Sequence, residues 1–209
     1  MNIQSIKSRL LFLVENRVFY FKGTRKDVAE KYLQELKTFK GISDSDRIKL
    51  EIECRGRFPR SFKKFLKEMG GACGQLFYGC DICPANTSQL RMKELAGEII
   101  EDGGIENFLK PSDFIFVFFQ GVSFYYIQAE GERNSAVYEY EEGAKAPVKV
   151  SGSFEDFIEK QLTKMEEKYT TYKNTGGYSL TLSEEGYMSM MFGGKVSSSP
   201  FESRDEFIP

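Results

Sequence analysis

The alternation of apolar and charged positions between residues 58 and 71 predicts a short amphipathic helix with a defined start and end. Its apolar residues recur at i, i+3, i+4 and i+7, which places on one face Phe62, Phe65, Leu66 and Met69. Pro59 suits the first turn of a helix, because the backbone donors of that turn have no partner within the helix. The pair Gly70-Gly71 supplies the left-handed residue at which helices commonly end. We therefore expect a helix over residues 60–69, with a sheet packed against its apolar face.

The same periodicity predicts helices over residues 2–16, 43–55, 88–101 and 153–162. A further helix is expected to begin after Thr24, which forms a capping pair with Asp27, and to end at Gly41. Within residues 43–55 we expect Ile48 and Ile52 to face inward, although the alternation of apolar residues there also fits a strand.

Several runs of β-branched and aromatic residues predict strands. Residues 114–119 read FIFVFF, a continuous apolar run, so both faces of this strand should be covered and it should be central in a sheet. A tight turn at Gly121-Val122 leads into residues 123–128, and residues 136–140 alternate as a half-exposed strand does. Near the C-terminus, residues 178–182 and 187–192 fit a hairpin.

The composition excludes several classes of function. The chain of 209 residues contains no histidine, which removes Ser-His-Asp, Cys-His and His-metal chemistry. Its net charge of −2 gives no basic field, so nucleic acid is not expected as a partner. No apolar run approaches the roughly 20 residues of a membrane span, and the N-terminal apolar block lacks a small-residue cleavage site. Carboxylate pairs, Lys, Tyr and Cys remain possible catalytic groups at this point. We expect a cytoplasmic protein that has no cofactor and no membrane contact.

The four cysteines allow more than one interpretation. Cys73, Cys80 and Cys83 follow a C-x6-C-x2-C spacing with Cys54 upstream, and the last two have the spacing of a zinc knuckle. Only one C-x2-C pair is present, whereas a zinc ribbon needs two. We interpret the four residues as reduced thiols that bind no metal, with a structural zinc site or a redox pair as the alternatives.

The order of motifs along the chain is more specific than any one of them. A Phe-Pro-x-Ser-Phe-Lys-x-Phe-Leu helix and a Gly-Gly pair are followed by a Pro-x-Asp-Phe-Ile-Phe strand, a Tyr-Tyr-Ile strand, an Ala-Val-Tyr strand and a Ser-Phe-Glu-Asp-Phe-Ile helix. This order resembles the SUKH superfamily, which includes fungal cell-wall assembly regulators and bacterial immunity proteins. The matching residues, within about residues 43–165, are Phe58, Pro59, Phe62, Phe65, Leu66, Gly70, Gly71, Asp113, Phe114, Ile115, Phe118, Tyr125, Tyr126, Ile127, Val137, Tyr138, Ser153, Phe154, Phe157 and Ile158. The sequence departs from the pattern at Phe58, where the family often has Leu, and at Gln120-Gly121-Val122, which replaces a Gly-Asp pair.

The resemblance implies an α+β fold with a single, mainly antiparallel sheet and flanking helices. It implies a non-catalytic protein-binding domain, and first of all a bacterial immunity protein that neutralises a polymorphic toxin by direct binding. The alternative is a general regulatory or protein-interaction module of SUKH type, like the cell-wall synthesis regulators, without a toxin partner. We expect a helical N-terminal extension at residues 1–42, the SUKH-like domain at 43–168 and a Gly/Ser/Tyr-rich C-terminal extension at 169–209.

Two parts of the sequence are candidates for contact with such a partner. The loop at residues 74–86 is irregular, aromatic and partly charged, and within it we select Tyr78 and Asp81. The acidic runs at 98–102 and 139–142 are typical of solvated faces. An acidic surface also suits the capture of a basic toxin nuclease, because opposite fields steer the encounter.

Overall fold

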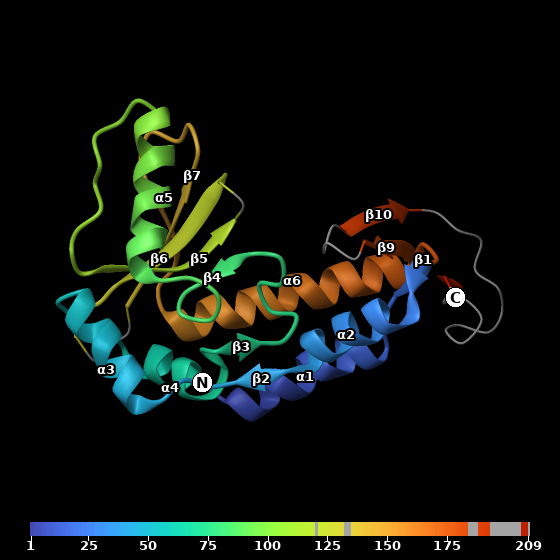
Figure 1. The fold of residues 1–209 in the computed structure, drawn as a ribbon. Helices are drawn as coiled ribbons and strands as arrows, with labels where there is room; N and C mark the ends of the chain where they lie inside the picture. Colours follow the sequence, from blue (N-terminus) through green and yellow to red (C-terminus); the bar gives the residue numbers. More distant parts are fainter. Residues whose placement is uncertain (120, 132–134, 184–187, 193–205, 209) are drawn as a thin grey trace. The chain divides into compact units, whose positions relative to one another are not determined.

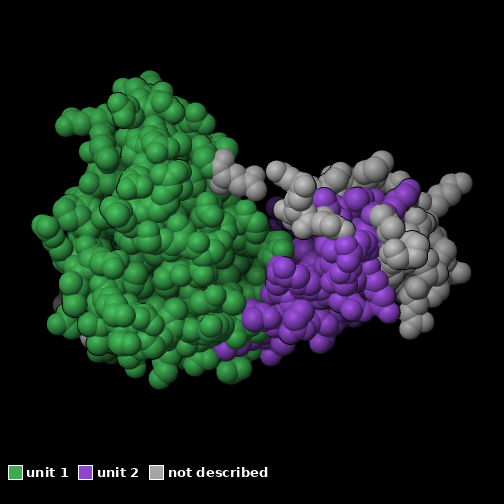
Figure 2. All heavy atoms as spheres, in the orientation of Figure 1, with its two compact units in different colours: residues 1–4, 39–160 green, residues 5–38, 161–209 purple. Residues whose placement is uncertain are grey.

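The computed structural model describes residues 1–119, 121–131, 135–183, 188–192 and 206–208, which form two compact units. Unit 1 comprises residues 1–4 and 39–160, and unit 2 comprises residues 5–38 and 161–209 (Figure 2). Figure 1 shows the order of the helices and strands along the chain. Unit 1 contains a five-stranded and a two-stranded sheet, and unit 2 contains a four-stranded sheet.

Unit 1 is built on a five-stranded antiparallel sheet with strands in sequential order. The strands are β4 (Asp81–Ile82), β5 (Asp113–Phe119), β6 (Ser123–Gln128), β7 (Val137–Glu141) and β8 (Val148–Ser151). Every neighbouring pair is antiparallel, as tight connections between consecutive strands require. The predicted α+β class is therefore confirmed, with this sheet at the centre of the unit.

One face of the sheet is covered by aromatic residues of two helices, α4 (Arg60–Met69) and the first part of α6 (Phe154–Asn174). The Phe62 ring lies 4.8 Å from the Phe154 ring and 5.5 Å from the Phe114 ring of β5. All four apolar residues predicted for the inner face of α4 are buried. The helix predicted at residues 60–69 and its packing against a sheet are thus confirmed.

The opposite face of the sheet is covered by α5 (Gln89–Asp102) and by the segment that follows it. Phe108 of that segment packs against Tyr126 and Tyr140, with ring centroids 6.4 and 5.2 Å apart. Successive side chains of a strand point to opposite faces, and both faces of this sheet are covered. Strand β5 is therefore buried along nearly its whole length. The prediction that both faces of this strand are covered is confirmed.

Helix α3 (Asp44–Glu53) begins where predicted, but its buried face differs from the prediction. The Ser43 hydroxyl caps the helix by accepting a hydrogen bond from the backbone N–H of Asp46 at 3.1 Å. Ile48 and Ile52 are 48% and 70% exposed, so the expectation that they face inward is wrong. The buried face instead carries Glu51, whose carboxylate binds groups in the following segment and thereby sets the rotation of the helix.

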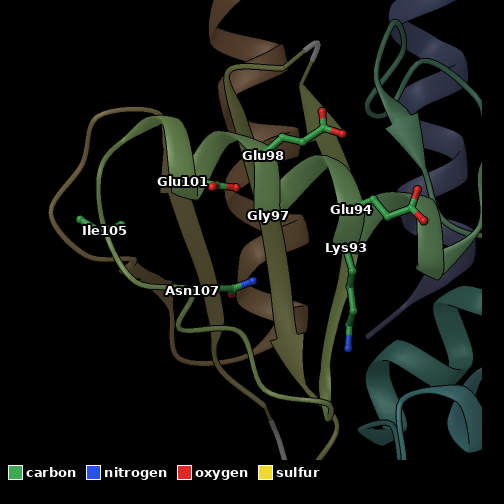
Figure 3. A pocket seen from close by; sticks show the side chains of 7 residues that line it. All are labelled: Lys93, Glu94, Gly97, Glu98, Glu101, Ile105 and Asn107. Atoms are coloured by element: carbon green, nitrogen blue, oxygen red, sulfur yellow. The ribbon is translucent and has the colours of Figure 1, made fainter.

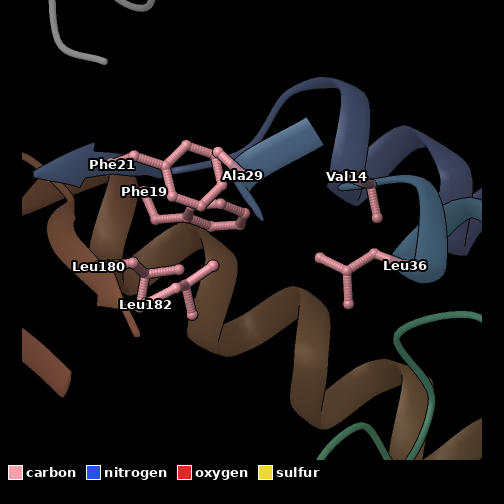
Figure 4. Close-up of a cluster of buried hydrophobic side chains, with 7 residues drawn as sticks. All are labelled: Val14, Phe19, Phe21, Ala29, Leu36, Leu180 and Leu182. Carbon is pink, nitrogen blue, oxygen red and sulfur yellow. The ribbon is translucent and has the colours of Figure 1, made fainter. Parts of the chain in front are cut away.

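Unit 2 contains a four-stranded sheet in the order β10-β9-β1-β11. Its strands are β1 (Phe19–Arg25), β9 (Tyr178–Leu182), β10 (Met188–Phe192) and β11 (Glu206–Ile208). Strand β1 is parallel to β9 and β11, whereas β9 and β10 pair antiparallel. The core of the unit, shown in Figure 4, consists of Val14, Phe19, Phe21, Ala29, Leu36, Leu180 and Leu182. The unit also contains most of α1 (Ile3–Glu15) and all of α2 (Lys26–Lys37).

The sequence did not reveal that segments from both ends of the chain would share one sheet. Thr24 was expected to cap a helix, but it lies in β1, and its buried hydroxyl accepts a hydrogen bond from the backbone N–H of Leu182 at 3.0 Å. Helix α2 ends at Lys37, before the predicted end at Gly41, because Phe39 and Lys40 form strand β2 and pair with β3 (Ala72–Cys73). Tyr187, predicted at the start of the second hairpin strand, lies outside the described residues. The division of the chain at residues 42 and 168 stays a prediction.

Candidate functional site

A hollow of about 450 Å³ lies on the outer side of α5 (Figure 3). Five residues of the helix and two of the following segment line it: Lys93, Glu94, Gly97, Glu98, Glu101, Ile105 and Asn107. Three of its glutamates are spaced at i, i+4 and i+7, which places them along one helix face. Gly97 leaves room between them, since a Cβ atom there would come no closer than 3.8 Å to the Asn107 amide nitrogen. The hollow is therefore open, and three of its seven lining residues are glutamates.

The cations near the hollow offset only part of its negative charge. The Arg91 guanidinium lies 3.3 Å from the Glu94 carboxylate and 3.7 Å from that of Glu98. The Lys93 ammonium donates to the carbonyl oxygens of Lys110 and Pro111, at 3.3 and 2.8 Å. The Glu101 carboxylate forms no ion pair with the part of the chain that the structure describes, and it is exposed. The outer face of α5 therefore carries a net negative charge that attracts cationic groups.

Lys93 and Asp113 hold the segment after α5 in place. The backbone N–H of Lys110 donates to the Asp113 carboxylate at 2.8 Å, and the N–H of Asp113 donates back to the Lys110 carbonyl at 3.1 Å. Lys93 binds the same turn from the helix, and burial lowers the pKa of its ammonium group. Asp113 is 2% exposed, and burial raises the pKa of its carboxyl group. This turn contains the Pro-x-Asp-Phe motif, and Lys93 ties it to α5.

The loop singled out by the sequence is a chain of hydrogen-bonded turns. Backbone N–H groups of Leu76, Tyr78 and Cys80 each donate to the carbonyl three residues earlier, at 3.1–3.2 Å. Tyr78 is 40% exposed at the tip, and Asp81 follows in β4, where it is half-buried. The structure thus places Tyr78 in a turn and Asp81 in the strand that follows it, and their contact with a partner stays a prediction.

The outer edge of β4 is closed by a single residue, through its side chain and its backbone N–H. The Asn86 amide oxygen accepts from the N–H of Ile82 at 2.6 Å, and the N–H of Asn86 donates to the Ile82 carbonyl at 3.0 Å. The Asn86 amide nitrogen also donates to the Cys80 carbonyl at 3.3 Å. These bonds take up the backbone groups that an edge strand would otherwise present to another strand.

The cysteines are positioned as buried or half-buried thiols. Cys54 and Cys73 donate through sulfur to the carbonyl oxygens of Leu50 and Leu76, both at 2.7 Å. Burial raises the pKa of Cys54 and Cys80 to about 11 and that of Cys73 and Cys83 to about 12. In the described part of the chain, no three Cys, Asp or Glu side chains are grouped as metal ligands.

The acidic residues noted in the sequence separate into two places. Glu98 and Glu101 line the hollow, whereas the run at 139–142 lies on β7 and in the turn after it and does not contribute to the lining. Sequence reasoning missed Gly97, whose position inside a helical row of glutamates is a signal for an open carboxylate face. It also missed Lys93 and Asn107. The sequence has no signal for them, because their contacts form only when the segment after α5 folds against that helix.

None of the helices in the described ranges is both long enough and apolar enough to cross a membrane.

The fold defines a class of protein, namely an α+β domain with helices packed on an antiparallel sheet. A family model supplies the particular assignment: the SMI1 / KNR4 family (SUKH-1) matches residues 41–160, more than half of the chain. The chain belongs to this family, so the resemblance read from the motifs is confirmed. SUKH proteins bind protein partners in immunity or regulatory roles, and the family is generally non-enzymatic. No curated protein matches the chain.

Proposed function

We propose that this protein is an immunity-type binding protein, which neutralises a toxin domain with a basic surface by direct contact. Family membership supports a protein-binding role, and the carboxylate-lined hollow on α5 is the observation that carries the choice of a basic partner. The protein acts by covering the toxin and needs no bond-making chemistry of its own.

The charge arrangement gives this proposal a physical basis. Surface charges of opposite sign steer two proteins together and raise the association rate, an effect that falls with ionic strength. Glu94, Glu98 and Glu101 share one face, and Gly97 between them lets a long cationic side chain approach the helix. An Arg or Lys of the partner entering the hollow would find carboxylates on α5.

Co-expression tests the proposal directly. Each toxin domain encoded beside this gene is produced in a bacterial host with and without this protein, and survival and complex formation are measured. We expect rescue of growth and a stable complex with one of them. Failure of every such domain to bind, together with no rescue, would overturn the proposal.

Charge reversal in the hollow tests the basis of the interaction. Glu98→Lys and Glu101→Lys should each lower the association rate with that toxin domain about tenfold at low salt and much less at high salt. Glu141→Lys is the matched control, because Glu141 is an exposed glutamate on β7 outside the hollow. Equal effects of all three substitutions would argue against the hollow as the contact.

The second candidate is a regulatory interaction module of SUKH type, to which family membership gives equal support. A gene with no toxin gene beside it, whose product binds a cellular regulator through the same hollow, would favour this role over toxin neutralisation.

A further inference from the structure

We propose that the turn at residues 77–80 is an anchor that inserts into the partner. Tyr78 enters an apolar recess on the partner, and Asp81 pairs with an Arg or Lys at the rim of that recess. The inference rests on the proposed function, because it requires a protein partner, but it uses a surface distinct from the hollow on α5.

The segment around the turn is poor in charged residues and yet partly exposed. In residues 70–90, Asp81 is the only charged residue, whereas a segment of 21 residues at the chain average of 29% would carry about six. Burial does not account for this, because Tyr78, Gly79, Asn86, Ser88 and Leu90 are exposed. Interface cores are poor in charged residues and rich in tyrosine, so an exposed, nearly uncharged segment with a tyrosine at its tip has the composition of a contact surface.

The backbone of the turn is held in an unusual conformation. Phe77 has a φ of +61°, a region that bulky side chains rarely adopt, and such outliers cluster at functional sites. Gly79, with a φ of +81°, occupies the position of a tight turn at which glycine is favoured. This path leaves Leu76 almost fully buried and exposes Tyr78 two residues later.

Packing keeps the turn in this conformation. The Phe77 ring stacks on Phe157 at 6.1 Å with an interplanar angle of 18°, and it lies edge-on to Phe116 at 6.3 Å. The N–H of Cys80 donates to the Phe77 carbonyl at 3.1 Å, and the Asn86 side chain binds the carbonyl of Cys80 at 3.3 Å. A turn that is ordered before binding loses little conformational entropy in the complex, which is the property expected of an interface anchor.

The chemistry of the turn specifies the partner surface that it fits. A phenol ring at the tip suits an apolar recess with a hydrogen-bond acceptor or water near its base. The carboxylate of Asp81 directly after the turn selects a cation at the rim, which agrees with the basic partner already proposed. A nucleic acid is a poor fit, because residues 70–90 contain no Lys or Arg.

The test measures the Kd of the toxin domain identified by co-expression, using the full-length protein. Tyr78→Ala should raise the Kd about 30-fold or more, as truncation of an anchor residue does, whereas Tyr78→Phe should change it less than about threefold. Asp81→Asn should raise the Kd less and should reduce its dependence on salt. Val148→Ala is the control, because Val148 is 62% exposed on β8 of the same sheet, and it should leave the Kd unchanged.

The outcomes separate the two proposals. If the wild-type protein binds and Tyr78→Ala binds as tightly, the anchor is overturned and the proposed function stands. If Tyr78→Ala and Val148→Ala weaken binding equally, the anchor is also overturned. If no toxin domain binds the wild-type protein, both proposals fall together.

Discussion

The carboxylate of Glu51 accepts a hydrogen bond from the backbone N–H of Phe58 at 2.8 Å, although the two residues belong to different segments of unit 1. Glu51 is 8% exposed, and its other partners are the Arg47 guanidinium at 2.6 Å and the Lys63 ammonium at 3.4 Å. One buried carboxylate therefore links α3 to the start of α4 and holds Phe58 where it packs on Phe114.

Replacement of Glu51 should be costly for stability. Glu51→Ala leaves the Phe58 N–H without its acceptor and removes the partner of two cations, so we expect the free energy of unfolding to fall by about 2–4 kcal/mol. Glu51→Gln keeps an acceptor and should cost less. Chemical denaturation measures both, and Glu53→Ala, an exposed neighbour on α3, should stay within about 0.5 kcal/mol of wild type.

Gly97→Ala should stabilise the fold and weaken binding. Alanine is favoured over glycine within a helix by about 0.8–1 kcal/mol, and the added methyl group meets no atom closer than 3.8 Å. The same methyl group narrows the hollow between the glutamates. We expect a higher melting temperature and a weaker complex in one variant, and a variant with unchanged affinity would contradict a role for the hollow.

The ion pair between Arg9 and Glu166 should make unit 2 sensitive to acid. The hydrogen bond from Arg9, at 2.8 Å, holds the pKa of the Glu166 carboxyl group below its usual value of 4.5. Because the pKa is lowered in the folded state, the ion pair stabilises the folded protein above pH 4.5. This contribution is lost as the pH falls through the folded-state pKa. Because Glu166 is 40% exposed, the contribution is under about 1 kcal/mol.

Hydrogen exchange of α1 amides between pH 3 and 6 would show this dependence. The measured quantity is the free energy of exchange, corrected for the intrinsic pH dependence of amide exchange. In Glu166→Gln this free energy should lose its acid-dependent part, and at the lower end of the range it should match that of wild type. A wild-type pH profile that persists in the variant would assign the acid sensitivity to other groups.

The cysteines should react slowly in the folded protein. The thiolate is the reactive form, and with a pKa of about 11 the Cys80 thiol is ionised in only about one molecule in a thousand at pH 8. Alkylation by iodoacetamide should therefore be about 100-fold slower than in the denatured chain and should accelerate about tenfold per pH unit. Fast alkylation at neutral pH would show a stabilised thiolate and would reopen the zinc and redox alternatives.

The sequence predicted those elements whose apolar pattern reflects local geometry. The face of α4 is defined by Phe62 and Met69 because a helix with one apolar stripe has only one way to bury it. Helix α3 has apolar residues on two sides, and the choice between them depends on Glu51 and Phe58, which meet only in the folded chain. Thr24 was misread for the same reason, since its hydroxyl binds the backbone of Leu182, 158 residues away.

The candidate site, too, could be predicted only where the sequence pattern is local. Glu98 and Glu101 could be named from their charge, and Tyr78 and Asp81 from the character of their loop. The hollow itself could not be predicted, because the packing of Asn107 beside Gly97 is formed only in the folded chain.

The parallel pairing of β1 with β9 and β11 has a practical consequence for anyone preparing fragments of this protein. Phe21 of β1 is aligned with Leu180 of β9, so a fragment that stops before residue 178 leaves that phenylalanine without its neighbouring strand. A fragment that starts after residue 25 has the reverse defect, with Leu180 and Leu182 uncovered. A fragment whose boundaries are chosen from one end alone would therefore expose apolar side chains and tend to aggregate.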